Sequence, residues 1–191
     1  DQHAVIANVA MDRPHQGVAY ERFTSSGPMA LLPSRDPDGN ENVFALVWTV
    51  KSSERDEVLG LDDAAFLAQL QQRIGDRAGR FIKVGDRFVY PLGWMQSREH
   101  VRQRLAIIGN AAHSLHPVAG QGFNLGLRDV AALAQVILDG VRQGQDPGDL
   151  ALLQGYAKWR RRDQLETALF TDGLVRAFST AFPPLALARN L

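Results

Sequence analysis

Residues 104–129 read Arg104-Leu-Ala-Ile-Ile-Gly-Asn-Ala-Ala-His-Ser-Leu-His-Pro-Val-Ala-Gly-Gln-Gly-Phe-Asn-Leu-Gly-Leu-Arg-Asp129, and this stretch decides the fold that we expect. Leu105–Ile108 is a short apolar run of the kind that a parallel sheet buries on both faces, so it predicts a buried strand. Gly120 and Gly122 let the backbone approach a ligand closely. A helix beginning near Phe123 would present unpaired N–H groups and its positive dipole end. The pattern predicts a strand, a loop and a helix that hold an electron-rich group.

The same stretch resembles the second flavin motif of the FAD-dependent aromatic hydroxylases, which has the form G-D-A-A-H-x-x-x-P-x-x-G-Q-G-x-N-x-G-x-x-D. The matching residues are Gly109, Ala111, Ala112, His113, Pro117, Gly120, Gln121, Gly122, Asn124, Gly126 and Asp129. Asn110 is the one departure, because most of the family has an aspartate there that binds the ribityl chain of the flavin.

Asn110, Gln2–Val9 and His15–Thr24 narrow the resemblance to the ubiquinone-biosynthesis hydroxylases of the 2-octaprenyl-6-methoxyphenol hydroxylase type. The resemblance covers essentially all 191 residues. It implies a fold of class α+β or α/β, the central and C-terminal part of a p-hydroxybenzoate-hydroxylase-like FAD monooxygenase. No G-x-G-x-x-G follows a predicted strand, so we expect a fragment that lacks the N-terminal dinucleotide-binding part and is inactive alone.

Two parts are expected within the chain. Residues 1–100 form a mostly antiparallel substrate-domain sheet with a helical insert, and residues 101–191 form the second FAD motif and C-terminal helices. Strands are predicted over Ala4–Met11, Gln16–Phe23, Met29–Leu32, Val43–Val50 and Phe81–Tyr90, the first two as a hairpin. Helical spacing covers Glu54–Gly60 and Asp62–Ile74, with Asp62 as the N-cap residue.

Two longer helices are expected in the second part. The first places its apolar residues at steps of three and four, which predicts that this face packs inward. These residues are Phe123, Leu127, Val130, Ala134, Ile137, Leu138 and Val141. The second helix runs from about Asp149 to Phe178, and its segment Lys158–Asp163 resembles the family's Y-x-x-x-R-x-x-D pattern. The three consecutive arginines of that segment are expected to form a solvated face, as basic runs on helices usually do.

The resemblance implies an FAD-dependent monooxygenase that uses NAD(P)H as reductant and a flavin C4a-hydroperoxide to hydroxylate a polyprenylated phenol in ubiquinone biosynthesis. The implied FAD-binding residues are Gly109, Asn110, Pro117, Gly120, Gln121, Gly122, Phe123 and Asn124. Val47 and Pro91 are expected to face the substrate ring. No side chain is expected to act as acid or base, because the flavin carries the chemistry. No metal site is expected, since His113 and His116 have no third ligand at short spacing.

Two other functions stay open: an FAD monooxygenase acting on another small aromatic or alkene, and a non-catalytic module for self-association or for docking into a complex. The expected partners are accordingly a polyprenylated phenol, a ubiquinone-biosynthesis complex and a second copy in a homodimer. Net charge is zero, with 45% hydrophobic and 22% charged residues, which argues against nucleic-acid binding. The absence of cysteine excludes disulfides and thiolate sites. A lipid-like substrate predicts a cytoplasmic location at the periphery of the inner membrane.

Overall fold

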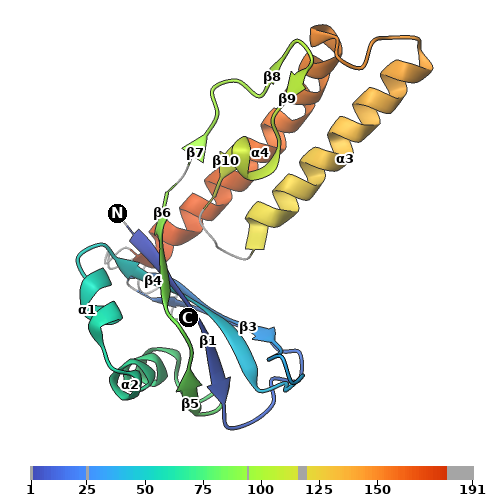
Figure 1. Cartoon of the computed structure of the whole chain (residues 1–191). Helices are drawn as coiled ribbons and strands as arrows, with labels where there is room; N and C mark the ends of the chain where they lie inside the picture. Colours follow the sequence, from blue (N-terminus) through green and yellow to red (C-terminus); the bar gives the residue numbers. More distant parts are fainter. Residues whose placement is uncertain (1, 25, 94, 116–119, 180–191) are drawn as a thin grey trace. The chain divides into compact units, whose positions relative to one another are not determined.

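The computed structural model describes residues 2–24, 26–93, 95–115 and 120–179 (Figure 1). The described chain divides into two compact units. The second is Gly93–Leu174, and the first contains the residues before Gly93 and the end of the last helix from Val175. The predicted boundary near residue 100 stays a prediction. All pairings between described strands are antiparallel.

The first unit is a six-stranded sheet with two helices. Its elements are β1 (Gln2–Met11), β2 (Tyr20–Thr24), β3 (Gly27–Ser34), β4 (Val43–Lys51), α1 (Arg55–Gly60), α2 (Asp63–Ile74), β5 (Phe81–Val84) and β6 (Phe88–Leu92). The strand order is β2-β3-β4-β1-β5, and β6 also pairs with β1. The strand predicted over Val43–Val50 and both helices of the insert are confirmed.

The predicted hairpin between the first two strands is wrong. β1 is central, because β4 occupies one of its edges, and β5 and β6 share the other. No edge is left for β2, which pairs with β3 instead. The single strand predicted over Phe81–Tyr90 is two strands, which separate where the Gly85 amide donates to the Asn8 carbonyl at 2.9 Å.

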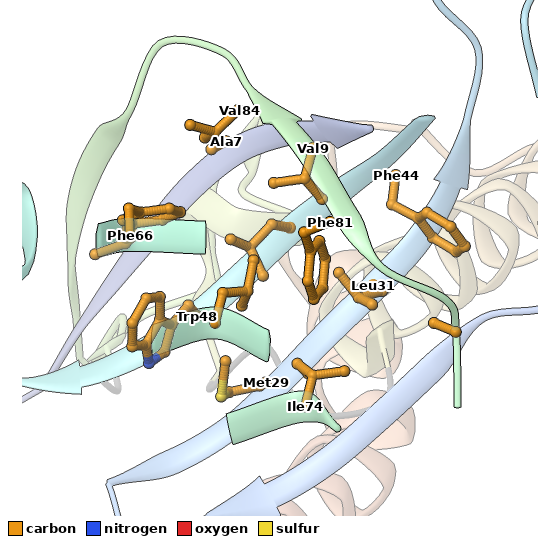
Figure 2. Close-up of a cluster of buried hydrophobic side chains, with 14 of the residues drawn as sticks. Ala7, Val9, Met29, Leu31, Phe44, Trp48, Phe66, Ile74, Phe81 and Val84 are labelled. Carbon is orange, nitrogen blue, oxygen red and sulfur yellow. The ribbon is translucent and has the colours of Figure 1, made fainter. Parts of the chain in front are cut away.

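The core of this unit lies between one sheet face and α2 (Figure 2). Alternate residues of the central strands point inward, including Val9 of β1 and Trp48 of β4. Phe66 of α2 packs on them, its ring centroid 5.3 Å from that of Trp48. Asp62 caps α2 as predicted, since its carboxylate accepts a hydrogen bond of 2.7 Å from the Ala65 amide.

The second unit consists of short strands and two long helices. Its elements are β7 (Met95–Gln96), β8 (Val101–Arg102), β9 (Leu105–Ala106), the 3₁₀ turn η1 (Gly109–Ala111), β10 (His113–Ser114), α3 (Gln121–Arg142) and α4 (Leu150–Ser179). β7 pairs with β10, and β8 pairs with β9. The two long helices confirm the predictions of a helix starting near Phe123 and of one from about Asp149.

Two expectations about this unit are wrong. The strand predicted as buried and parallel is only β9, which pairs antiparallel with β8 and leaves Leu105 53% exposed. The predicted inward face of α3 points to solvent instead: Phe123 is 78% exposed and Leu127 56% exposed. A different face of α3 is buried, and its residues are Leu125, Asp129, Ala132 and Gly140. The reason is that Asp129 takes part in a buried polar network, which sets the rotation of the helix.

Candidate functional site

The candidate site is organised around the fully buried carboxylate of Asp129 on α3. One oxygen, Oδ2, accepts from the Gly109 amide at 3.3 Å and lies 2.6 Å from Nε2 of His113. The other, Oδ1, accepts from Nε of Arg160 at 2.8 Å and from Nε2 of Gln164 at 3.1 Å. One side chain therefore joins the loop after β9, the short strand β10 and both long helices.

Asp129 is ionised at neutral pH. Burial alone would raise its pKa, but the hydrogen bonds from His113, Arg160 and Gln164 outweigh burial and lower the pKa to about 2. An ionised carboxylate only accepts hydrogen bonds, so Nε2 of His113 must carry the hydrogen that it shares with Asp129. This fixes the tautomer and the orientation of an imidazole that is 3% exposed.

Arg160 and Gln164 come from α4, and neither was predicted as a site residue from the sequence. The prediction of a solvated arginine face is wrong for Arg160, which is 5% exposed and also pairs with Asp163 at 2.6 Å. Tyr156, Arg160 and Gln164 recur every four residues and are all buried, so they form one face of α4. The Y-x-x-x-R-x-x-D resemblance was the available signal, because it picks out Tyr156, Arg160 and Asp163.

Charges at this site also affect Tyr156. Burial, followed by the negative charge of Asp129, raises the pKa of the Tyr156 phenol to about 12. The pKa of the Arg160 guanidinium is also raised, because its hydrogen bonds to Asp129 and Asp163 outweigh the effect of burial. The network therefore keeps one carboxylate and one guanidinium charged over the whole physiological pH range.

The loop at Gly109, which follows β9, approaches α3 closely. A Cβ atom placed on Gly126 would lie 3.3 Å from the Cα of Gly109, which is a backbone contact that a side chain would push apart. Gly109 has φ of +60°, in the left-handed region that favours glycine. Glycines at both positions therefore let α3 and the loop touch.

Within the part of the chain that the structure describes, the N-terminus of α3 is open, because no side chain caps it. Gly120, its N-cap residue, has φ of +62° and no side chain to accept hydrogen bonds from the first-turn amides. A Cβ atom placed on Gly120 or Gly122 would meet no atom of a described residue within 4 Å. First-turn amides at the positive end of a 22-residue helix, which no side chain of the N-cap residue caps, fit an electron-rich group such as the edge of a flavin ring.

The other predicted cofactor residues lie on these same two segments. Asn110 is exposed in η1, next to Gly109. Gln121 is half-buried in the first turn of α3, and Phe123 and Asn124 are exposed there. Pro117 lies outside the described residues.

The structure does not bring Val47 and Pro91 to one surface. Val47 is in register with Ile6, and Ile6 with Phe88, so these three side chains share the sheet face opposite the core. Pro91 follows Tyr90 along β6, and Tyr90 shares the face of Phe88 two residues before it. Side chains alternate along a strand, so Pro91 belongs to the other face.

The sequence that forms this site matches a known protein family. The family model described as "FAD binding domain" matches residues 3–167. The chain belongs to the FAD binding domain family. The matched range contains both the network around Asp129 and the open N-terminus of α3.

Two curated relatives of this chain carry names that indicate a pathway. Ubiquinone hydroxylase UbiL of Rhodospirillum rubrum is 45% identical over 190 residues, which are 100% of this chain and 43% of that protein. The human mitochondrial ubiquinone biosynthesis monooxygenase COQ6 is 31% identical over 224 residues, covering 100% of this chain and 47% of that protein. The chain therefore spans less than half the length of either relative.

A solved structure shows the same fold. The crystal structure of pqsL, a probable FAD-dependent monooxygenase from Pseudomonas aeruginosa, matches with a TM-score of 0.72 and 20% identity. The match covers 100% of this chain and 52% of that one. The chain thus has the fold of part of an FAD-dependent monooxygenase, as the motif predicted.

Two further findings concern other kinds of site. Among the described residues, no three histidine, cysteine or acidic side chains lie close enough together to hold a metal ion. Within the same ranges, no helix has both the length and the apolar character needed to cross a bilayer.

Proposed function

We propose that the full-length polypeptide carrying this sequence is an FAD-dependent aromatic-ring monooxygenase that hydroxylates a polyprenylated phenol in ubiquinone biosynthesis. The observation that carries the proposal is the loop at Gly109, which Asp129 holds by a hydrogen bond, together with the open N-terminus of α3. The pathway is proposed from the names of the relatives UbiL and COQ6.

Bound FAD would supply the oxygen chemistry, with NAD(P)H as its reductant. The chain's own residues bind and orient it. Amides of the first turn of α3, from Gly122 to Asn124, would stabilise negative charge on the flavin ring edge, as an oxyanion hole does. Asn110 can donate and accept hydrogen bonds toward the ribityl chain. Asp129 holds the adjacent Gly109 amide in place, so the loop needs little rearrangement when the cofactor binds.

The sheet unit offers an apolar surface for the substrate. Phe88 and Tyr90 are each 56% exposed on β6, and Phe88 shares its face with Ile6 and Val47. Aromatic rings and aliphatic side chains on one face suit contact with a phenol ring and its prenyl tail. We therefore assign the substrate-facing role to Val47 and its face neighbours, and not to Pro91.

The proposed setting follows from the substrate. A polyprenyl tail resides in a membrane, so the protein would act in the cytoplasm at the periphery of the inner membrane. A complex of ubiquinone-biosynthesis proteins and a homodimer are the proposed protein partners.

The test compares wild type with Gly122→Val in the full-length polypeptide. Gly122 has open space around it, so valine should leave the fold intact and fill the space proposed for the flavin. Gly155→Val is the matched control, because Gly155 is an exposed helical glycine of α4 with nothing within 4 Å. Each protein is assayed for retained FAD, and for incorporation of one oxygen atom into a prenylated phenol by mass spectrometry.

We expect G122V to lose both the flavin and the product, and G155V to keep them. Flavin retention by G122V would refute the assigned cofactor site. Retained flavin with oxidation only of small, unprenylated substrates would refute the proposed substrate while leaving the cofactor site intact.

A further inference from the structure

The second unit contains a cavity that the flavin site does not use. It is open, has a volume of about 760 Å³ and lies between the segment around β7 and one face of α4. The described residues that line it are Met95, Gln96, Ser97, Arg98, His100, Ala157, Arg161 and Gln164. No aspartate or glutamate is among them.

Arginine side chains of this unit differ in whether they form an ion pair with an acidic side chain. Residues Gly93–Leu174 contain eight arginines, and six of them form an ion pair with an acidic side chain. These six are Arg102, Arg104, Arg128, Arg142, Arg160 and Arg162. The remaining two, Arg98 and Arg161, have no ion pair with a described acidic residue, and both line this one cavity.

Acidic neighbours that could neutralise the two arginines are already engaged. Glu99, next to Arg98, pairs with Arg102 at 2.6 Å. Glu166, on the same helix as Arg161, pairs with Arg162 at 2.7 Å. Two like charges that face one cavity, with no counter-charge among the described residues that line it, favour binding of an anion there.

We propose that this cavity binds the phosphate group of a ligand through Arg98 and Arg161. The planar guanidinium presents two parallel N–H groups that match phosphate oxygens, so two arginines on opposite walls can hold one phosphate or diphosphate. The Gln96 side-chain amide adds an N–H donor to the same wall. The volume exceeds that of a single phosphate, and Met95 and Ala157 provide apolar surface for the rest of the ligand.

Gln164 connects the cavity to the loop at Gly109 through hydrogen bonds. It is 4% exposed, lines the cavity and donates to Asp129, whose other oxygen holds the Gly109 amide. An anion in the cavity would therefore lie one side chain away from the network. The site itself needs no flavin, so it can be tested without the enzymatic activity.

The experiment measures binding of inorganic pyrophosphate to the full-length polypeptide by calorimetry, and binding to phosphatidylglycerol vesicles by co-sedimentation. The double variant R98Q/R161Q removes the two unpaired arginines. R102Q/R162Q is the matched control, since it removes the same charge from the same two segments but from arginines that have partners. Circular dichroism checks that both variants remain folded.

We expect pyrophosphate to bind wild type, R98Q/R161Q to bind it about tenfold more weakly or worse, and the control to change by less than about threefold. Vesicle binding lost only in R98Q/R161Q, without pyrophosphate binding, would also support the site and identify a lipid headgroup as the source of the phosphate. Three results would overturn the proposal: binding of neither probe, equal weakening in both double variants, or complete displacement of pyrophosphate by FAD.

Discussion

Replacing Asp129 with asparagine is the most informative single change to this chain. The side chain keeps its size, but one of its two oxygens becomes an NH₂ group. Toward Arg160 and Gln164, that group would meet two donors. Toward the other side it would meet the Gly109 amide, and only His113 could change tautomer to accept from it. Each orientation leaves at least one buried donor without a partner.

The size of the effect can be estimated in two ways. Breaking a buried ion pair by removing one partner costs about 3 to 5 kcal/mol, and the low end applies because Arg160 keeps Asp163. Lowering the Asp129 pKa from 3.8 to about 2 corresponds to roughly 2.5 kcal/mol of stabilisation at neutral pH. Both routes predict that D129N lowers the free energy of unfolding by about 3 kcal/mol.

The pH dependence separates this mechanism from simple loss of packing. Because the folded-state pKa is lowered, the stabilisation is complete well above pH 3.8 and is lost as the pH falls through about 2. About half of it should be gone at pH 3. The difference between wild type and D129N should therefore shrink by about 1 kcal/mol between pH 7 and pH 3.

The assay is urea unfolding at both pH values, followed by circular dichroism. D139N is the control, since Asp139 is an acidic residue on the same helix whose exposed ion pair with Arg142 should contribute less than about 1 kcal/mol. A D129N penalty below about 1 kcal/mol at pH 7, or one that is equal at pH 7 and pH 3, would refute a charged carboxylate at the centre of the network.

Three further substitutions test other parts of the fold. Gly126→Ala should weaken FAD binding by the full-length polypeptide, measured by fluorescence titration, because its Cβ lies 3.3 Å from the Gly109 backbone; unchanged affinity would contradict the close contact. Asp62→Ala should lower the free energy of urea unfolding by about 1 kcal/mol through loss of the cap to the Ala65 amide, and no change would contradict a capping role. Phe66→Ala should lower it by about 3 to 5 kcal/mol, since its ring is fully buried, whereas a loss below about 1 kcal/mol would show that the side chain is not in the core.

Local patterns in the sequence predicted the helices well. Asp62 caps α2 because its carboxylate accepts a hydrogen bond from the Ala65 amide, which would otherwise be free. The two residues are three positions apart, so the local sequence contains the whole signal. The open N-terminus of α3 was predicted for the same kind of reason, since Gly120 and Gly122 act through their own backbone.

Strand pairing and helix rotation, which depend on residues far apart in the sequence, were harder to predict. The pairing of β2 with β3 depends on which strands occupy β1, and this information is not local to residues 16–24. The rotation of α3 was predicted from its apolar residues, yet a charged residue, Asp129, faces inward because it bonds Arg160 and Gln164 of α4. Those partners lie more than 30 residues away in the sequence, so no local pattern shows them. A buried charge is predictable only together with its partners.

The dependence of the Gly109 loop on α4 has a consequence for biosynthesis. Arg160 follows Asp129 by 31 residues, so the ribosome delivers it roughly 2 to 6 s later at typical elongation rates. During that interval the nascent chain holds an acidic residue on α3 whose basic counterpart has not been made. The loop can reach its final geometry only after α4 has emerged, which makes maturation of the cofactor cradle a late event in the synthesis of this unit.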